Sequence, residues 1–227
     1  MKAHEFMVHD DLGGSEFRGD SWAGHRIIAR LYDGDAELLT PEEQAVAREM
    51  TGLEVLPSEP PQELYIGAGR RSGKTRLVSV LATHAAAQDY GHRLAAGEWA
   101  VAACIAPDRR QARQLFGYCA GIVQNSPILR TEVTKETGDT IEFAHRTRLE
   151  IHTGSFRAVR GYTMCFAAVD EAGFLRDERS ANPDLELARA LKPALKTLSG
   201  RLVVISSLHQ KRGLMFDAYR RYYARAA

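Results

Sequence analysis

The sequence predicts an α/β fold in which a mostly parallel central sheet is flanked by helices. Apolar runs of strand length alternate with amphipathic runs of helix length from residue 63 onward. The last apolar run, residues 202–206, is nearly all β-branched, as expected of a strand covered on both faces. A glycine-rich turn joins the first strand of this part to its first helix. Strand, turn and helix in this order are typical of α/β nucleotide-binding proteins.

The composition is that of one globular unit with a sizeable core. Of the 227 residues, 44% are hydrophobic and 26% are charged, and the net charge is +1. So small a charge excludes a protein that coats DNA over its whole surface, so any contact with nucleic acid must be local. No apolar run is long enough to cross a membrane, and three cysteines without metal-binding spacing indicate buried thiols in a reducing cytoplasm.

We expect residues 1–60 to form a helical lead-in packed on the core, and residues 61–227 to form the core itself. The first 20 residues combine glycines with acids and predict little structure. Helical patterns follow at residues 22–31 and 40–50. The second begins with an N-cap threonine, Thr40, and a proline at the first helical position, and Gly52 is its expected end.

The core alternates between strands and helices. A short apolar run at residues 63–67 predicts a buried strand, and residues 128–153 predict an antiparallel hairpin, with a turn at 137–139, inserted as an accessory. The remaining expected strands are 99–106, 162–169 and 202–206, and the expected helices are 74–88, 108–125 and 185–198.

The turn after the first strand carries the strongest chemical signal. It is a Walker A loop with alanine in place of the first glycine, and its residues are Ala68, Gly69, Arg70, Arg71, Ser72, Gly73, Lys74 and Thr75. Inward-pointing backbone N–H groups, a helix N-terminus and the Lys74 ammonium group suit the phosphates of ATP, and the Thr75 hydroxyl suits Mg²⁺. A chance Gly-Lys-Thr in a surface turn is the plain alternative, but the strand and helix on either side argue against it.

A second signal is an apolar strand that delivers Asp170 and Glu171 at its carboxyl end, which is a Walker B pattern. Asp170 is the expected ligand of Mg²⁺, and Glu171 is the expected base for a water in line with the γ-phosphate. An acidic pair after a strand can also be a simple helix cap. The strand at 202–206 ends in Ser206 and Ser207, which we expect to sense the γ-phosphate, with an ordinary strand end as the alternative.

Three arginines are candidates for neutralising the charge of a transferring phosphoryl group. Arg70 lies within the Walker A loop, and Arg160 and Arg157 lie just upstream of the Walker B strand. Solvent exposure is the alternative for Arg70, and a loop salt bridge is the alternative for Arg160.

Taken together, these motifs resemble those of the large terminase subunit of tailed bacteriophages. The match runs from about residue 64 to 223 and includes the arginine within the Walker A loop, the Arg160-Gly161 step, Asp170-Glu171, and Ser206-Ser207 followed by Gly213. The resemblance implies a P-loop NTPase fold of the additional-strand, catalytic-glutamate type. It also implies that Arg70 acts within its own subunit, and that Arg157 or Arg160 reaches a neighbouring site.

The same resemblance implies ATP-driven translocation of double-stranded DNA into a procapsid. The expected partners are the portal protein, the small terminase subunit and further copies of this chain in a ring on the portal, with a monomer left open for the isolated chain. The expected place is the cytoplasm of the infected bacterial host. Large terminases also carry a C-terminal nuclease, for which this sequence has no room, so we expect no DNA cleavage.

Two other functions fit the same core. A helicase-like, nucleic-acid-stimulated P-loop ATPase would use the same residues to separate strands. An assembly module that uses ATP as a structural switch without turnover is a further alternative, which the presence of Glu171 argues against.

Overall fold

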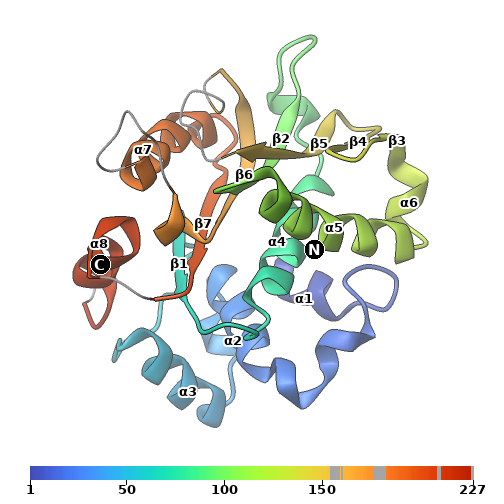
Figure 1. Cartoon of the computed structure of the whole chain (residues 1–227). Helices are drawn as coiled ribbons and strands as arrows, with labels where there is room; N and C mark the ends of the chain where they lie inside the picture. Colours follow the sequence, from blue (N-terminus) through green and yellow to red (C-terminus); the bar gives the residue numbers. More distant parts are fainter. Residues whose placement is uncertain (154–158, 160, 176–182, 209–210, 226–227) are drawn as a thin grey trace.

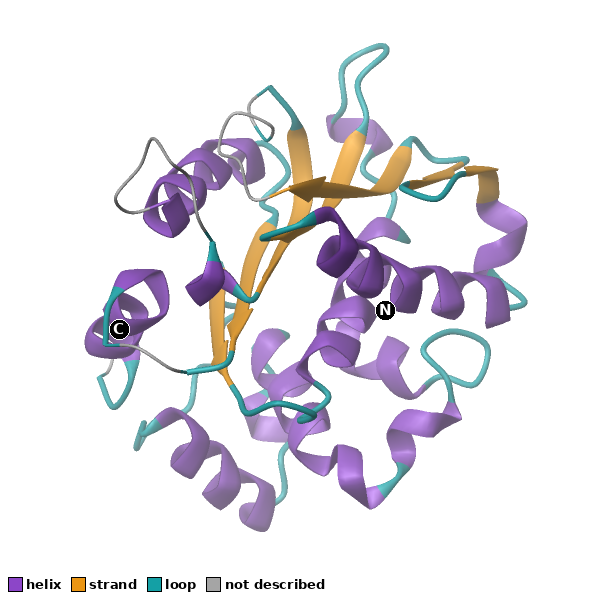
Figure 2. Cartoon of the chain, viewed as in Figure 1, coloured by secondary structure: helices purple, strands orange, loops and turns teal. Residues whose placement is uncertain are grey.

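A computed structural model of the chain describes residues 1–153, 159, 161–175, 183–208 and 211–225. Within these residues, one seven-stranded sheet runs through the molecule in the order β1-β7-β6-β2-β5-β4-β3. Helices cover both of its faces (Figures 1 and 2). The pairs among β1, β7, β6, β2 and β5 are all parallel, and β4 and β3 are antiparallel additions at one end. The predicted α/β fold with a mostly parallel sheet is confirmed.

The elements follow the expected chain order closely. The strands are β1 (Glu63–Gly67), β2 (Ala100–Ala106), β3 (Val133–Glu136), β4 (Thr140–Phe143), β5 (Thr147–Thr153), β6 (Thr163–Asp170) and β7 (Arg201–Ser206). The helices are α1 (Ala3–Val8), α2 (Ala23–Tyr32), α3 (Pro41–Thr51), α4 (Lys74–Ala86), α5 (Arg109–Asn125), α6 (Leu129–Glu132), α7 (Pro183–Lys196) and α8 (Gly213–Tyr222), with short 3₁₀ turns between some of them.

Alternating side chains of the central strands build two hydrophobic cores. On β2, Ala102 and Cys104 face the core that contains α4 and α5, whereas Val101 and Ile105 face the core that contains α7. Figure 1 shows α4, α5 and α1 on one side of the sheet and α7 and α8 on the other. Because both faces are covered, the central strands are apolar along most of their length.

The strand order places three strand ends side by side. The strand β7 lies between β1 and β6, so that Gly67 pairs with Ser206, and Asp170 pairs with Ile205. This is the additional strand expected between the Walker A and Walker B strands. Since parallel strands end at the same edge of a sheet, the glycine-rich loop, the acidic pair and the serine pair all emerge there.

The first 20 residues are more ordered than the sequence predicts. Residues 3–8 form α1, and Phe6, Met7 and Phe17 are almost fully buried in the same core as α4. The glycines that suggested a loose segment have a packing role, because a Cβ on Gly13 would lie 2.5 Å from the carbonyl oxygens of Phe6 and Met7. The expectation that the first 20 residues have little structure is therefore wrong.

Two further expectations need correction. The strand β1 is half-buried, because it is an edge strand of the sheet within the described residues. The hairpin β3–β4 exists, with Lys135 opposite Glu142, but it extends the central sheet through β4 and β5. It is therefore part of the main sheet, because β5 pairs in parallel with β2 along its whole length.

The signals predicted for the start and the end of the helix at residues 40–50 are both confirmed. Thr40 caps α3 by accepting a hydrogen bond from the backbone N–H of Glu43, and Gly52 ends this helix in the left-handed conformation. All three cysteines are free and buried. Among the described helices, none combines the length and the hydropathy of a membrane-spanning segment.

Candidate active site

The loop between β1 and α4 starts at the sheet edge and ends at a helix N-terminus. The backbone N–H of Ala68 donates to the carbonyl oxygen of Ser206 at 3.2 Å, which ties the start of the loop to β7. Arg71 and Gly73 have positive φ angles of 62° and 80°, so the chain turns sharply before α4 begins at Lys74. The N-terminus of α4, with its partial positive charge, therefore faces the same edge as Asp170 and Glu171.

Lys74 joins the loop to the other two strand ends. Its side chain is buried, and its Nζ lies 3.2 Å from Oε1 of Glu171 and 3.3 Å from Oγ of Ser207. Three segments that are far apart in the sequence thus converge on one ammonium group. The structure brings Lys74, Glu171 and Ser207 together at the place where the motifs predict a triphosphate.

Thr75 and Asp170 form a second contact beside the first. The Thr75 hydroxyl lies 3.4 Å from Oδ2 of Asp170, and Oδ1 of Asp170 is buried without a hydrogen-bond partner among the described residues. Burial, helped by the neighbouring Glu171 charge, raises the pKa of Asp170 to about 6. A buried carboxylate with an unused oxygen beside a hydroxyl is a donor set that suits Mg²⁺.

Glu171 is held in a constrained conformation. Its φ angle is 48°, which is uncommon for a residue with a side chain. Its Oε2 accepts a hydrogen bond of 3.1 Å from the backbone N–H of Ser207, and Oε1 lies 3.3 Å from the Ser207 hydroxyl. Burial alone would raise the pKa of Glu171, but the Ser207 backbone N–H and the Lys74 ammonium group outweigh it and lower this pKa. Glu171 is therefore ionised at neutral pH.

Ser206 connects the acidic pair to the following turn. Its hydroxyl accepts from the backbone N–H of Gly173 at 3.2 Å and lies 3.5 Å from Oε2 of Glu171. Ser206 is buried, whereas Ser207 is only half-buried and contacts both Lys74 and Glu171. Of the two serines, Ser207 is the better placed to report on a group bound at Lys74.

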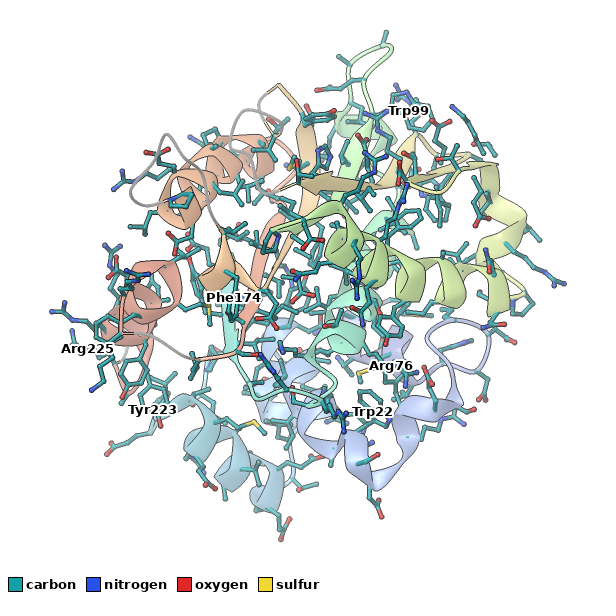
Figure 3. The ribbon with its side chains drawn as sticks, viewed as in Figure 1. Trp22, Arg76, Trp99, Phe174, Tyr223 and Arg225 are labelled. Carbon is teal, nitrogen blue, oxygen red and sulfur yellow. The ribbon has the colours of Figure 1, made fainter. Side chains whose placement is uncertain are left out.

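The lead-in also contacts the loop, which the sequence motifs do not indicate. Nε2 of His25 donates to the carbonyl oxygen of Ser72 at 2.8 Å, and burial lowers the pKa of His25 and keeps it neutral. A Cβ on Gly73 would lie 2.9 Å from the Trp22 ring and 3.0 Å from Nε2 of His25. Figure 3 shows Trp22 beside Arg76 of α4, whose guanidinium carbon lies 5.0 Å from the centre of the Trp22 ring. The sequence offered one signal of this contact: Trp22 and His25 are three residues apart in a predicted helix and therefore lie on the same face of it.

The predicted arginines are not part of the cluster that the structure describes. Arg70 and Arg71 are exposed, and neither has a recorded hydrogen bond or ion pair within the described part of the chain. Arg157 and Arg160 lie outside the described residues, so their placement stays a prediction. The cluster that is assembled consists of Lys74, Thr75, Asp170, Glu171 and the serine pair.

Comparisons with known proteins bear on the family of the chain. Residues 65–183, just over half of the chain, match the family model "Terminase large subunit, T4likevirus-type, N-terminal". No curated protein compared with the chain is similar to it in sequence.

Three similar solved structures are large terminases. A mutant of the ATPase domain of the Thermus phage P74-26 large terminase is 18% identical, covers 73% of this chain and 70% of its own, and has a TM-score of 0.47. The HK97 bacteriophage large terminase is 16% identical over 87% of this chain and has a TM-score of 0.49, and this chain spans only 41% of its length. Another structure of the P74-26 ATPase domain is 18% identical over 74% of this chain and 68% of its own, with a TM-score of 0.45.

The family match begins within β1, contains the Walker A loop and the acidic pair, and ends at the start of α7. It therefore includes Lys74, Thr75, Asp170 and Glu171, which the fold brings to one edge of the sheet. The chain belongs to the terminase large subunit family and corresponds to the N-terminal part of these proteins.

Proposed function

We propose that this chain is a motor domain that hydrolyses ATP and uses the energy to drive double-stranded DNA into a procapsid. The observation that carries the proposal is the convergence of Lys74, Glu171 and Ser207 within 3.3 Å contacts at the end of a parallel sheet. Family membership supports the biological context. The hydrolytic activity and the coupling to DNA are the steps that experiment must test.

The phosphates of ATP would be bound by the loop from Ala68 to Thr75. Backbone N–H groups of Gly69, Ser72 and Gly73 and the N-terminus of α4 offer partial positive charge, and Lys74 offers a full one. Phosphate oxygens at Lys74 would compete with Glu171 for the ammonium group, which now binds both Glu171 and Ser207. Nucleotide binding would thereby release the Glu171 carboxylate and report to β7 through Ser206 and Ser207.

Thr75 and Asp170 would hold Mg²⁺. The fit rests on the buried, unpartnered Oδ1 of Asp170 and on the Thr75 hydroxyl next to its other oxygen. When bound, the ion supplies positive charge to the β- and γ-phosphates. In the protein without a bound ion, desolvation destabilises the ionised Asp170 carboxylate and raises its pKa.

Glu171 would be the base that orients and deprotonates the attacking water. Its lowered pKa keeps the carboxylate ionised at neutral pH, and the Ser207 backbone N–H fixes the orientation of the carboxylate. A general base contributes about 10² to 10⁴ to the rate of such reactions. Glu171 is therefore the residue on which turnover should depend most, with least effect on nucleotide binding.

The remaining positive charge would come from arginines. Arg70 is exposed and within the phosphate loop, so it is available to act in its own subunit, and Arg157 or Arg160 would act on a neighbour in a ring. An arginine supplied by a neighbour is worth about 10³ to 10⁵ in rate. We therefore expect specific activity to rise with protein concentration. Equal specific activity across a wide dilution series would count against an arginine from the neighbour.

The proposed partners are double-stranded DNA, the portal protein and the small terminase subunit, in the cytoplasm of an infected bacterium. The decisive experiment measures ATP turnover by the wild type, Lys74→Ala and Glu171→Ala, with and without linear double-stranded DNA. Both variants should lose turnover, and DNA should stimulate only the wild type. Wild-type turnover no higher than that of Glu171→Ala would favour a nucleotide switch in place of a motor.

A second assay separates packaging from strand separation. Procapsids with a portal, supplied with this chain and linear DNA, should protect DNA from an added nuclease in an ATP-dependent manner. Strand displacement on a forked duplex, without protection by procapsids, would show a helicase and contradict the packaging proposal.

A further inference from the structure

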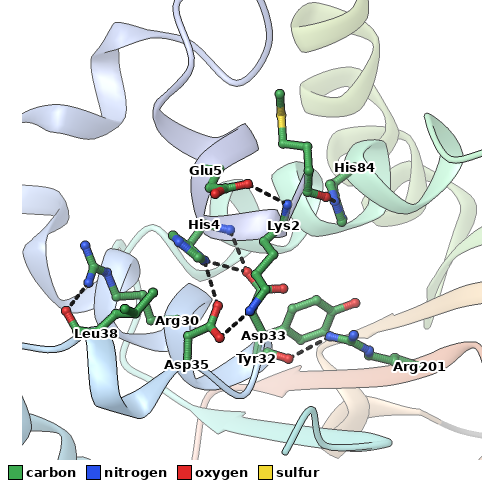
Figure 4. A network of polar contacts seen from close by, with 11 residues as sticks. Lys2, His4, Glu5, Arg30, Tyr32, Asp33, Asp35, Leu38, His84 and Arg201 are labelled. Carbon is green, nitrogen blue, oxygen red and sulfur yellow. Dashed lines mark hydrogen bonds and ion pairs between the residues drawn. The ribbon is translucent and has the colours of Figure 1, made fainter.

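A second polar cluster lies in the lead-in, near the C-terminal end of α4, where Nε2 of His84 lies 3.0 Å from the carbonyl oxygen of Met1. Figure 4 shows its members: Lys2 and His4 from the N-terminal segment, and Asp33 and Asp35 from the turn after α2. We propose that His4, Asp33 and Asp35 bind one divalent transition-metal ion, with Zn²⁺ as the best match, and that this ion fastens α1 to the turn after α2. The proposed ATPase activity plays no part in this inference.

The three ligand atoms already face one another. Nδ1 of His4 lies 2.9 Å from Oδ2 of Asp33 and 3.6 Å from Oδ2 of Asp35, and all three atoms lie within 4.8 Å of one another. Zinc bonds to nitrogen and oxygen of about 2.0–2.2 Å set neighbouring ligand atoms of a tetrahedral site about 3.4 Å apart. The pair with Asp35 is already close to that spacing, and the pair with Asp33 must open by about 0.5 Å to reach it.

One oxygen of the cluster points to a ligand. Asp35 is only 4% exposed, yet its Oδ2 accepts no hydrogen bond from any described residue. Its other oxygen, Oδ1, binds the ammonium group of Lys2, which orients the carboxylate and leaves Oδ2 directed at His4. A buried carboxylate oxygen without a partner is costly, and a cation supplies the missing interaction.

The charge balance of the cluster also favours a bound cation. Asp33 and Asp35 are both buried, and Lys2 is the one permanent cation in contact with the pair within the described residues. A bound cation would balance the negative charge that Lys2 leaves uncompensated. An imidazole with two carboxylates is a ligand set for Zn²⁺ and similar ions, whereas Mg²⁺ prefers oxygen ligands and retained waters.

The surrounding contacts fit a metal site. The backbone N–H of His4 donates to Oδ2 of Asp33 at 2.8 Å and orients this carboxylate, whereas Lys2, outside the ligand set, orients that of Asp35. Side chains of His4 and Lys2 are 13% and 53% exposed, which leaves a path from solvent and room for a water as fourth ligand. Bound metal would hold α1, which carries Phe6 and Met7 into the core.

The test uses the full chain, freed of metal by a chelator and of any purification tag. Co²⁺ is the spectroscopic probe, titrated until its visible absorption saturates, and Zn²⁺ is then used to displace it. We expect one equivalent to bind with nitrogen and oxygen ligands, Zn²⁺ to raise the unfolding temperature, and Mg²⁺ at the same concentration to do neither. Absence of binding by the wild type would overturn the proposal.

Two variants and two matched controls locate the ion. His4→Gln and Asp35→Asn should weaken metal binding by at least about tenfold, because even outer-shell changes cost about 10- to 100-fold. Exposed residues of the same types serve as controls, and His92→Gln and Asp20→Asn should bind as the wild type does. Unchanged binding in both cluster variants would place the ion elsewhere and refute the site.

The visible spectrum of Co²⁺ bound to the wild type provides a test that does not depend on the folding of any variant. Sulfur-to-cobalt charge-transfer absorption would assign the ion to Cys104, Cys119 or Cys165 and contradict the proposal. Asp170→Asn separates the two acidic sites, because it removes the predicted Mg²⁺ ligand and should leave Co²⁺ binding in the lead-in intact.

Discussion

Two clusters among the described residues each bring two carboxylates to a cation, one at the sheet edge and one in the lead-in. At the sheet edge, Asp170 and Glu171 are adjacent in sequence and share one lysine, Lys74, which binds Glu171. In the lead-in, Asp33 and Asp35 are two residues apart, and Lys2 binds Asp35 directly. The first cluster belongs to a sequence motif and the second does not.

The difference lies in how the backbone supports each cluster. Asp170 is the last residue of a central strand, so its position is set by the sheet, and its carboxylate is buried beside that of Glu171 with little compensation. The lead-in carboxylates lie on a turn and are oriented by hydrogen bonds from His4 and Lys2. A rigid sheet edge can hold charges that a turn must stabilise by local pairing.

The largest effect should come from Glu171→Gln. Glutamine has the shape of glutamate but cannot accept the proton of a water, so we expect kcat to fall by about 10² to 10⁴. Nucleotide affinity should change little, because Lys74 and the loop are intact. Single-turnover hydrolysis and fluorescent-nucleotide binding measure the two quantities separately, and Glu49→Gln, an exposed glutamate, is the control. A normal kcat in Glu171→Gln would remove Glu171 from the mechanism.

Next in size is the stability gained by Asp170→Asn. The pKa of Asp170 is raised from its ordinary value of 3.8 to about 6, so ionised Asp170 destabilises the fold at pH above 6. This cost grows as pH rises from 3.8 to about 6 and disappears below that window. At neutral pH the variant should therefore gain up to about 3 kcal/mol of unfolding free energy, since one pKa unit is about 1.4 kcal/mol. Urea unfolding at neutral pH and near pH 4 measures it.

The corresponding Asp→Asn substitution in the lead-in should change the unfolding free energy in the opposite direction. In metal-free protein, Asp35→Asn removes the charge that forms the ion pair with Lys2 and should lower the unfolding free energy. If both asparagine variants shift stability in the same direction at neutral pH, the proposed contrast between the two clusters is wrong.

A smaller effect is expected where the lead-in meets the phosphate loop. Trp22→Ala removes a half-buried ring that lies against Gly73, so we expect a loss of about 1–3 kcal/mol and a higher KM for ATP. Trp99→Ala is the matched control, because Figure 3 places this second half-buried tryptophan at the opposite end of the molecule. It should cost similar stability and leave KM unchanged. Equal KM values in both variants would show that Trp22 has no role in shaping the loop.

The smallest effect on stability should be that of Arg70→Ala. Arg70 is exposed and outside the Lys74 cluster, so the unfolding free energy should stay within about 0.5 kcal/mol of the wild type. Thermal unfolding tests this, and turnover of the same variant shows whether the arginine acts in catalysis. A large loss of stability would mean that Arg70 has a structural contact, and a loss of turnover could then not be assigned to chemistry.

Local signals in the sequence were enough for most element boundaries. The capping threonine of α3, the start of α5 directly after Asp108 and the apolar run of β2 each appear where the pattern predicts them. These features depend on the backbone and on neighbours within a few residues, so a single sequence contains the necessary information. The glycine-rich loop and the acidic pair were found for the same reason.

The sequence by itself determined most helices and strands between residues 22 and 206 and the two motifs, because periodicity and spacing act over short stretches of chain. It did not predict α1. Only the tertiary structure decided which strands are neighbours, that β1 is an edge strand, and that Trp22 and His25 contact the phosphate loop. It also brought His4 to Asp33 and Asp35. Periodicity reports that a face is buried, whereas the identity of the covering residue depends on packing between segments distant in the chain.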